Sequence, residues 1–253
     1  SALHWAAEEG FAHVVKILVD ANANLDLVDT NDSMSALHWA AWKGSTDMVQ
    51  MLVGAKAKLD LVGKDGWSAL HFAALKGSAS VVKILVAANA NLDLVEEEYG
   101  RSALLIAAKY GFADVVKVLV GANANLDLVD KLYGASALHF PGFKGSADVV
   151  KILVAANAKL DQLEEVGETP RDWAIKYKKG GWEDVVRLLD ARAVNDASVE
   201  VIEDSDATKN KEGLMESTES TLRPALCSHV AAHSELNNDT MEWLRKRFKV
   251  IKR

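Results

Sequence analysis

The chain has 253 residues, of which 49% are hydrophobic and 26% charged, an ordinary globular composition with enough apolar material for a sizeable core. Its net charge of −7 argues against general binding to nucleic acid. Cys227 is the only cysteine, so no internal disulfide can form, and we expect an intracellular location, cytoplasmic or nuclear. No apolar stretch approaches the roughly 20 residues that a membrane-spanning helix needs.

A four-residue motif, Ser-Ala-Leu-His, returns along the chain at nearly constant spacing. Its copies, the fourth ending in Leu and the sixth degenerate, begin at Ser1, Ser35, Ser68, Ser102, Ser136 and Thr169. The steps of 34, 33, 34, 34 and 33 residues predict a stack of similar helical units, none of which buries its apolar face alone. Because the chain begins with a serine at a motif start, we expect a fragment whose first repeat is truncated.

The third copy shows the elements that each unit should contain. Ser68 is suited to cap a first helix, which Gly77 should end. A second helix is expected from about Ser78 to Ala88, and Asn89 should follow it in the left-handed conformation. The apolar positions of the two helices recur at helical spacing: Leu70, Ala73, Ala74, Val81, Val82, Leu85 and Val86. Each unit is therefore predicted to be two antiparallel helices of about 10 residues each, joined to the next unit by a loop.

These residues resemble the ankyrin repeat. Residues 66–77 read GWSALHFAALKG, close to the family pattern G-x-T-P-L-H-x-A-A-x-x-G, and similar blocks cover roughly residues 1–194. The resemblance implies an all-α fold, an ankyrin-repeat solenoid of helix-turn-helix units with hairpin loops, followed by a mostly disordered tail. It also implies a concave groove, formed by the first helices and the hairpin tips, that binds other proteins.

Four copies depart from the repeat pattern. Leu105 replaces the motif histidine in the fourth copy, and Lys56 stands where a left-handed Gly or Asn is expected in the second. Pro141 should remove a hydrogen bond from the first helix of the fifth copy, so this repeat is expected to be the weakest. The sixth copy, which begins at Thr169, should have a first helix about one turn longer.

The motif histidines occupy equivalent positions, and we interpret them as structural groups that hydrogen-bond the backbone of the neighbouring repeat rather than as a metal or proton ladder. The aromatic residues at a second equivalent position are expected in the core; they are Trp5, Trp39, Phe72 and Phe140. The chain contains no phosphate loop, nucleophile motif or paired carboxylates outside the repeat pattern. We therefore expect no enzyme activity, no cofactor, no metal and no small-molecule substrate.

The partner-binding residues should lie at the ends of the first helices and on the hairpin tips, because these positions vary between copies. Aromatic residues beside Lys and Arg at such positions are typical of protein interfaces. The predicted contact residues are Trp42, Lys43, Trp67, Leu75, Lys76, Tyr99, Arg101, Lys109, Tyr110, Tyr133, Phe143 and Lys144. They predict an adaptor or scaffold that acts as a monomer and binds a protein in the groove. The alternative is the recruiting arm of a larger enzyme or channel.

The repeat pattern ends near residue 194. Residues 195–222 hold eight acidic residues against Lys209 and Lys211, which predicts a disordered acidic linker. Residues 223–253 should end in a basic amphipathic helix, Met241–Arg253, with a membrane surface, a calmodulin-like groove or a nucleic acid as alternative ligands. That helix could equally pack against the acidic linker or begin a further domain.

Overall fold

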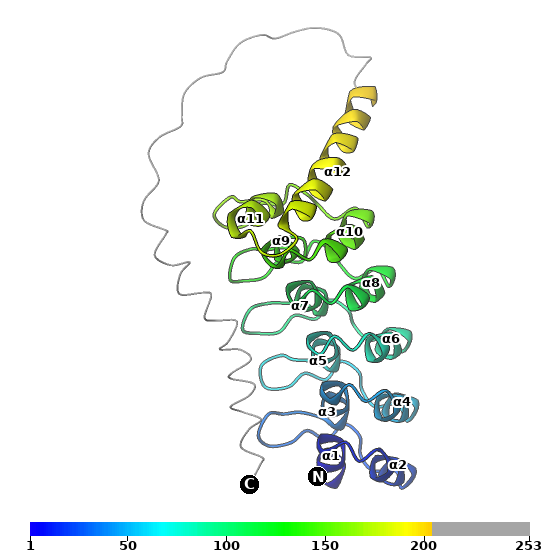
Figure 1. Cartoon of the computed structure of the whole chain (residues 1–253). Coiled ribbons are helices and arrows are strands. Elements are labelled where there is room, and N and C mark those ends of the chain that lie inside the picture. Colours follow the sequence, from blue (N-terminus) through cyan, green and yellow to red (C-terminus); the bar gives the residue numbers. More distant parts are fainter. Residues whose placement is uncertain (204–253) are drawn as a thin grey trace. The chain divides into compact units, whose positions relative to one another are not determined.

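The computed structural model describes residues 1–203, except for the side chains of Phe143 and of residues 194–203. This part of the chain contains twelve helices in two rows (Figure 1). The inner row consists of α1 (Ala2–Glu9), α3 (Ala36–Lys43), α5 (Ala69–Leu75), α7 (Ala103–Tyr110), α9 (His139–Lys144) and α11 (Pro170–Tyr177). The outer row consists of α2 (Ala12–Asp20), α4 (Thr46–Gly54), α6 (Ala79–Ala87), α8 (Ala113–Gly121), α10 (Ala147–Ala155) and α12 (Trp182–Glu203).

Each helix packs against the next helix of its own row and against its partner in the other row. The loops between the pairs form hairpins, three of which are closed by isolated backbone bridges: Val62 with Ser68, Val95 with Ser102, and Val129 with Ser136. No extended strand forms within residues 1–203. The predicted all-α repeat stack is confirmed, although its helices have six to nine residues up to α11 rather than about ten.

The motif serine and histidine form a reciprocal cap at the start of the inner helices. In α3 the Ser35 side chain accepts the backbone N–H of His38, and the Ser35 backbone N–H donates to His38 Nδ1 at 2.9 Å. The same arrangement begins α5 with Ser68 and His71. Here histidine does what Glu or Gln does in the usual capping box. The motif is therefore a helix start signal.

The second imidazole nitrogen ties the inner helices that carry the motif histidine to the loop that leads into the next repeat. Nε2 of His38 donates to the carbonyl oxygen of Leu61 at 2.9 Å, and Nε2 of His71 donates to that of Leu94 at 3.0 Å. Because Nδ1 accepts and Nε2 donates, each ring is held as the neutral Nε2–H tautomer. The structural interpretation of these histidines is confirmed.

The outer helices end in left-handed residues, as expected. Asn89 has a φ of 64°, and Lys56 adopts the same conformation with a φ of 64° although it is neither Gly nor Asn. A recurring aspartate then joins neighbouring loops: Asp60 Oδ1, for example, accepts the backbone N–H of Asn91 at 2.9 Å. The loops are thus linked from repeat to repeat by backbone N–H groups that donate to aspartate side chains.

The fifth repeat accommodates Pro141 by starting its inner helix late. Ser136 caps no helix directly, since α9 begins at His139 and Leu138 precedes it in a turn. Pro141 consequently lies in the first turn of α9, where its missing N–H has no intrahelical acceptor to lose. Ser136 still donates its backbone N–H to His139 Nδ1 at 3.1 Å. Contrary to the expectation from the sequence, Pro141 therefore does not remove a hydrogen bond from within the helix; the helix is shorter instead.

Gly142 allows the shortened helix α9 to lie close to α11. A Cβ atom at this position would lie 2.6 Å from the carbonyl oxygen of Pro170. We therefore expect Gly142→Ala to lower the free energy of unfolding by roughly 1–3 kcal/mol in urea titrations. Gly121→Ala is the matched control: no atom lies within 4 Å of its added Cβ, so its stability should stay the same or rise. Equal effects of the two substitutions would contradict this packing.

The sixth repeat has a longer loop, and the prediction of a longer inner helix is wrong. Helix α11 ends at Tyr177 because Lys178 turns into the left-handed conformation with a φ of 45°. The outer helix α12 continues past the predicted boundary at 194 to Glu203. The rest of the predicted acidic linker and the predicted basic helix, Met241–Arg253, lie outside the described residues. No helix within 1–203 is long and apolar enough to cross a membrane.

Three of the four aromatic residues predicted in the core are buried: Trp39, Phe72 and Phe140 are 5%, 5% and 4% exposed. Trp5 is 57% exposed, so its predicted burial is wrong. Trp39, Phe72 and Phe140 lie on helices that have an inner helix on both sides, whereas α1 packs against α3 on one side and no described element packs on the other. Burial at this position therefore depends on having a repeat on both sides.

Candidate binding surface

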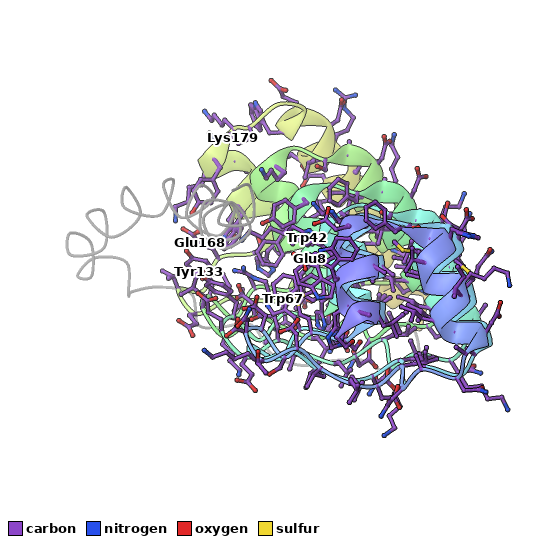
Figure 2. All side chains as sticks on the ribbon, turned by 90° about the horizontal axis from the view of Figure 1, so that it is seen from below. Glu8, Trp42, Trp67, Tyr133, Glu168 and Lys179 are labelled. Atoms are coloured by element: carbon purple, nitrogen blue, oxygen red, sulfur yellow. The ribbon has the colours of Figure 1, made fainter. Side chains whose placement is uncertain are left out.

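We define the inner face as the surface formed by the last turns of the inner helices and by the hairpin tips. Figure 2 shows Trp42, Trp67 and Tyr133 on the side of the inner helices that faces away from the outer row. The inner face contains most of the predicted contact residues, although their exposure differs. Trp42, Trp67, Tyr99, Tyr110 and Tyr133 are half-buried, so part of each ring reaches solvent.

Trp42, Trp67 and Phe72 form an aromatic cluster between the second and third repeats. The Phe72 ring packs edge-on against Trp42 with ring centroids 5.8 Å apart, and Trp67 lies against Phe72 at 5.2 Å. Lys76 places Nζ 3.7 Å from the centroid of the Trp42 ring, within cation–π distance. Burial, followed by the charge of Lys43, lowers the pKa of Lys76. The cluster thus holds two indole rings and an ammonium group in fixed positions.

A second cluster surrounds Lys109. Its Nζ atom lies 5.9 Å from the centroid of Tyr99 and 5.8 Å from that of Tyr110. Burial, together with the nearby cations Arg101 and Lys144 and against the opposing effect of Asp130, lowers the pKa of Lys109 to about 8. Burial also raises the pKa of the Tyr110 hydroxyl, which therefore stays protonated. The Lys109 ammonium group therefore lies within cation–π distance of both tyrosine rings.

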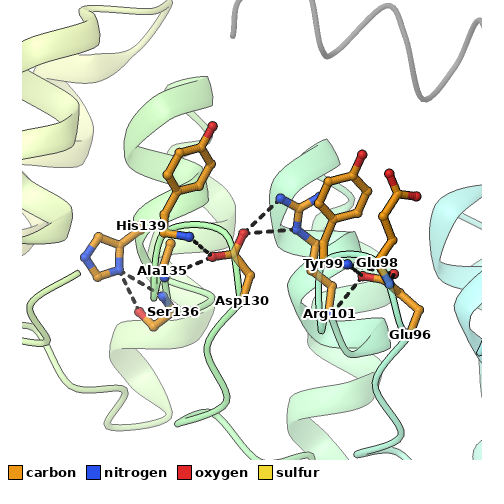
Figure 3. A network of polar contacts seen from close by, with 9 residues as sticks. Glu96, Glu98, Tyr99, Arg101, Asp130, Ala135, Ser136 and His139 are labelled. Carbon is orange, nitrogen blue, oxygen red and sulfur yellow. Dashed lines mark hydrogen bonds and ion pairs between the residues drawn. The ribbon is translucent and has the colours of Figure 1, made fainter. Parts of the chain in front are cut away.

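Arg101 is buried, and the prediction that it is an exposed contact residue is wrong. Only 5% of the residue is exposed, and its Nε and NH2 groups donate to Asp130 Oδ2 at 3.2 and 2.8 Å (Figure 3). The guanidinium carbon lies 4.4 Å from the centroid of the Tyr99 ring. Arg101 therefore holds Tyr99 and joins two successive hairpins instead of facing a partner.

Buried carboxylates organise the hairpin tips, and the sequence analysis did not single them out. Glu96 accepts the backbone N–H groups of Tyr99 and Arg101, both at 3.0 Å. Asp130 accepts those of Tyr133 and Ala135 at 3.0 and 3.1 Å (Figure 3). Both acids precede the motif serine at equivalent positions, a regularity that could have identified them. These hydrogen bonds fix the backbone that presents Tyr99 and Tyr133.

The remaining predicted contact residues have different surroundings. Leu75 is 7% exposed, so it belongs to the core, contrary to the prediction. Lys43 is exposed and Lys144 half-buried, whereas the side chain of Phe143 lies outside the described residues. Tyr133 packs edge-on against Trp173, with ring centroids 6.0 Å apart, a neighbour that the sequence analysis missed.

The geometry supports binding by shape and charge. Within the described residues, no three His, Cys, Asp or Glu side chains gather as a metal site would require. The inner face instead combines half-buried rings with lysine side chains on a scaffold of packed helices.

Comparisons with known proteins agree with this architecture. The family model for ankyrin repeats in sets of three copies matches residues 1–62 and 54–130, more than half of the chain. The crystal structure of EF0377, an ankyrin-repeat protein, is similar with a TM-score of 0.68 and 24% identity, over 75% of this chain and 96% of that one. A search of curated proteins found no match. The chain therefore belongs to the ankyrin-repeat family.

Proposed function

We propose that this chain is an adaptor or scaffold that binds a partner protein on its inner face. Ankyrin repeats are generally protein–protein interaction modules. The observation that carries the proposal is the uneven distribution of aromatic residues. The outer helices α2, α4, α6, α8 and α10 contain no Phe, Trp or Tyr, and α12 contains one, Trp182 at its start, whereas the inner face presents Trp42, Trp67, Tyr99, Tyr110 and Tyr133.

The half-buried rings are held in place before any partner arrives. Trp42 is fixed by Phe72 and Lys76, and Tyr99 by Arg101, so binding would order few side chains. Interfaces built on rigid aromatic anchors lose less conformational entropy on association. The single cysteine, Cys227, supports the further proposal that the protein works inside the cell, in the cytoplasm or nucleus.

Binders selected from a displayed library of protein segments would test this proposal. We expect Trp42→Ala with Tyr133→Ala to weaken a selected binder by at least about 10-fold, because central aromatic residues dominate interface energies. The control is Ile84→Ala with Ile152→Ala, which removes half-buried side chains from outer helices α6 and α10. Thermal melts would separate folding from binding. The proposal would be contradicted if the isoleucine substitutions weakened the selected binders and the aromatic substitutions did not.

A further inference from the structure

A lysine recurs at the end of each inner helix from the second repeat onward. These residues are Lys43, Lys76, Lys109, Lys144 and Lys176. The helix dipole favours a lysine near a helix C-terminus. If the dipole alone explained these lysines, they should occur at the ends of the outer helices as well. The outer helices α2, α4, α6, α8 and α10 have no basic residue in their last turn. The dipole therefore does not account for lysines on one row alone.

Four of these lysines, which we term the lysine row, form no direct ion pair in the described part of the chain; they are Lys43, Lys76, Lys109 and Lys144. Lys176 is paired with Glu168 at 2.8 Å, and four other lysines form ion pairs elsewhere, but no described carboxylate lies within 4.0 Å of the lysine row. Burial is the largest cause that lowers the pKa of Lys76 and of Lys109, and repulsion from neighbouring cations adds to it: Lys43 acts on Lys76, and Arg101 and Lys144 act on Lys109. A bound anion would relieve that repulsion.

The spacing of the lysine row matches an extended peptide. Packed helices lie about 8–10 Å apart, so successive lysines are displaced along the stack by about that distance. An extended chain rises about 3.3 Å per residue, and every third residue therefore advances by about 10 Å. The rings of Trp42, Tyr99 and Tyr110 lie beside the lysines and offer apolar surface to the residues between the charges.

We propose that the lysine row binds an extended acidic segment of a partner protein, with Asp or Glu at every third residue. This inference rests on the proposed function and names the chemistry of its partner. Glu8 and Glu9 stand at the corresponding end of α1, where no lysine occurs. A segment that continues past Lys43 would meet these acids, so a basic residue is expected at that end of the segment.

Fluorescence anisotropy with the full chain would test the proposal. The probe is a labelled 12-residue peptide with Glu at every third position; one comparison peptide carries the same four Glu residues in a row, and another carries Gln instead. Because the chain has a net charge of −7, an acidic peptide gains nothing from the protein's overall charge. We expect the spaced peptide to bind more tightly than both comparison peptides, and its affinity to fall as salt rises.

Two double variants with the same change in net charge provide the decisive comparison. Lys76→Gln with Lys109→Gln should weaken the spaced peptide by roughly 5- to 10-fold, as expected for two lost charge pairs on a partly exposed surface. Lys83→Gln with Lys117→Gln removes two exposed lysines from outer helices α6 and α8 and should change the affinity by less than about 2-fold.

Equal losses in the two double variants, or no preference for the spaced peptide, would overturn the acidic-segment proposal. The proposed function can survive this result, because display-selected binders would still depend on Trp42 and Tyr133. If substitution of the aromatic residues left the affinity of the selected binders unchanged, the proposed function itself would be wrong. The two failures are therefore distinguishable.

Discussion

Arg101→Met is expected to lower the free energy of unfolding by about 3–5 kcal/mol. The Arg101 and Asp130 side chains are only 7% and 0% exposed, and the substitution would leave the carboxylate buried without its cation. Two backbone N–H groups would still donate to Asp130, but they do not carry a compensating charge. The loss should also loosen Tyr99, since its ring lies against the guanidinium group. Urea titrations at neutral pH would measure the effect.

Two controls separate this buried pair from an ordinary ion pair. Lys159→Met breaks an exposed pair with Asp127, whose side chains are 58% and 52% exposed, and should cost less than about 1 kcal/mol. Arg101→Met with Asp130→Asn removes both buried charges and should recover part of the lost stability. If Arg101→Met were no more damaging than Lys159→Met, the pair would not hold the hairpins together.

Acidification should unfold the array mainly through two motif histidines. Burial lowers the pKa of His38 and of His71 from 6.5 to about 4. Above pH 6.5 both the folded and the unfolded states hold neutral imidazoles, so stability is highest there. As the pH falls from 6.5 toward 4, the unfolded chain gains protons that the folded chain does not accept. Each histidine should therefore remove up to about 3 kcal/mol over this window.

The fourth repeat suggests the variant that tests this pH dependence. Leu105 occupies the histidine position there and is 1% exposed, so the fold accommodates leucine at this site. His71→Leu should be less stable than the natural chain at pH 7, because the backbone N–H of Ser68 loses its acceptor. Its free energy of unfolding should nevertheless fall less steeply between pH 6.5 and 4. An unchanged slope in urea titrations across this range would contradict the assignment.

The features that were predictable from the sequence depend on neighbouring residues. Ser68 and His71 cap α5 through contacts three residues apart, and Asn89 ends the next outer helix through its own backbone preference. The period then places equivalent side chains in rows. These local rules were sufficient to predict the fold and the approximate position of the inner face.

The features that were missed depend on contacts between repeats. Arginine is a residue type that often anchors interfaces, yet Arg101 is buried because it pairs with Asp130 on the next hairpin. Trp5 matches Trp39 in position but lacks a covering repeat. Pro141 breaks a local rule, and the inner helix of its repeat starts late, at His139, so that the proline lies in the first turn. Repeat periodicity predicts which positions are equivalent, whereas burial and pairing depend on the residue that faces each of them.

The most direct test of recognition on the inner face is NMR of the lysine side chains. Dimethylation with ¹³C-formaldehyde labels each amine while keeping its charge, and a display-selected binder can then be added. Binding on the inner face should shift the signals of Lys76 and Lys109 and leave those of Lys83 and Lys117, on the outer helices, unchanged. Shifts confined to Lys83 and Lys117 would contradict it.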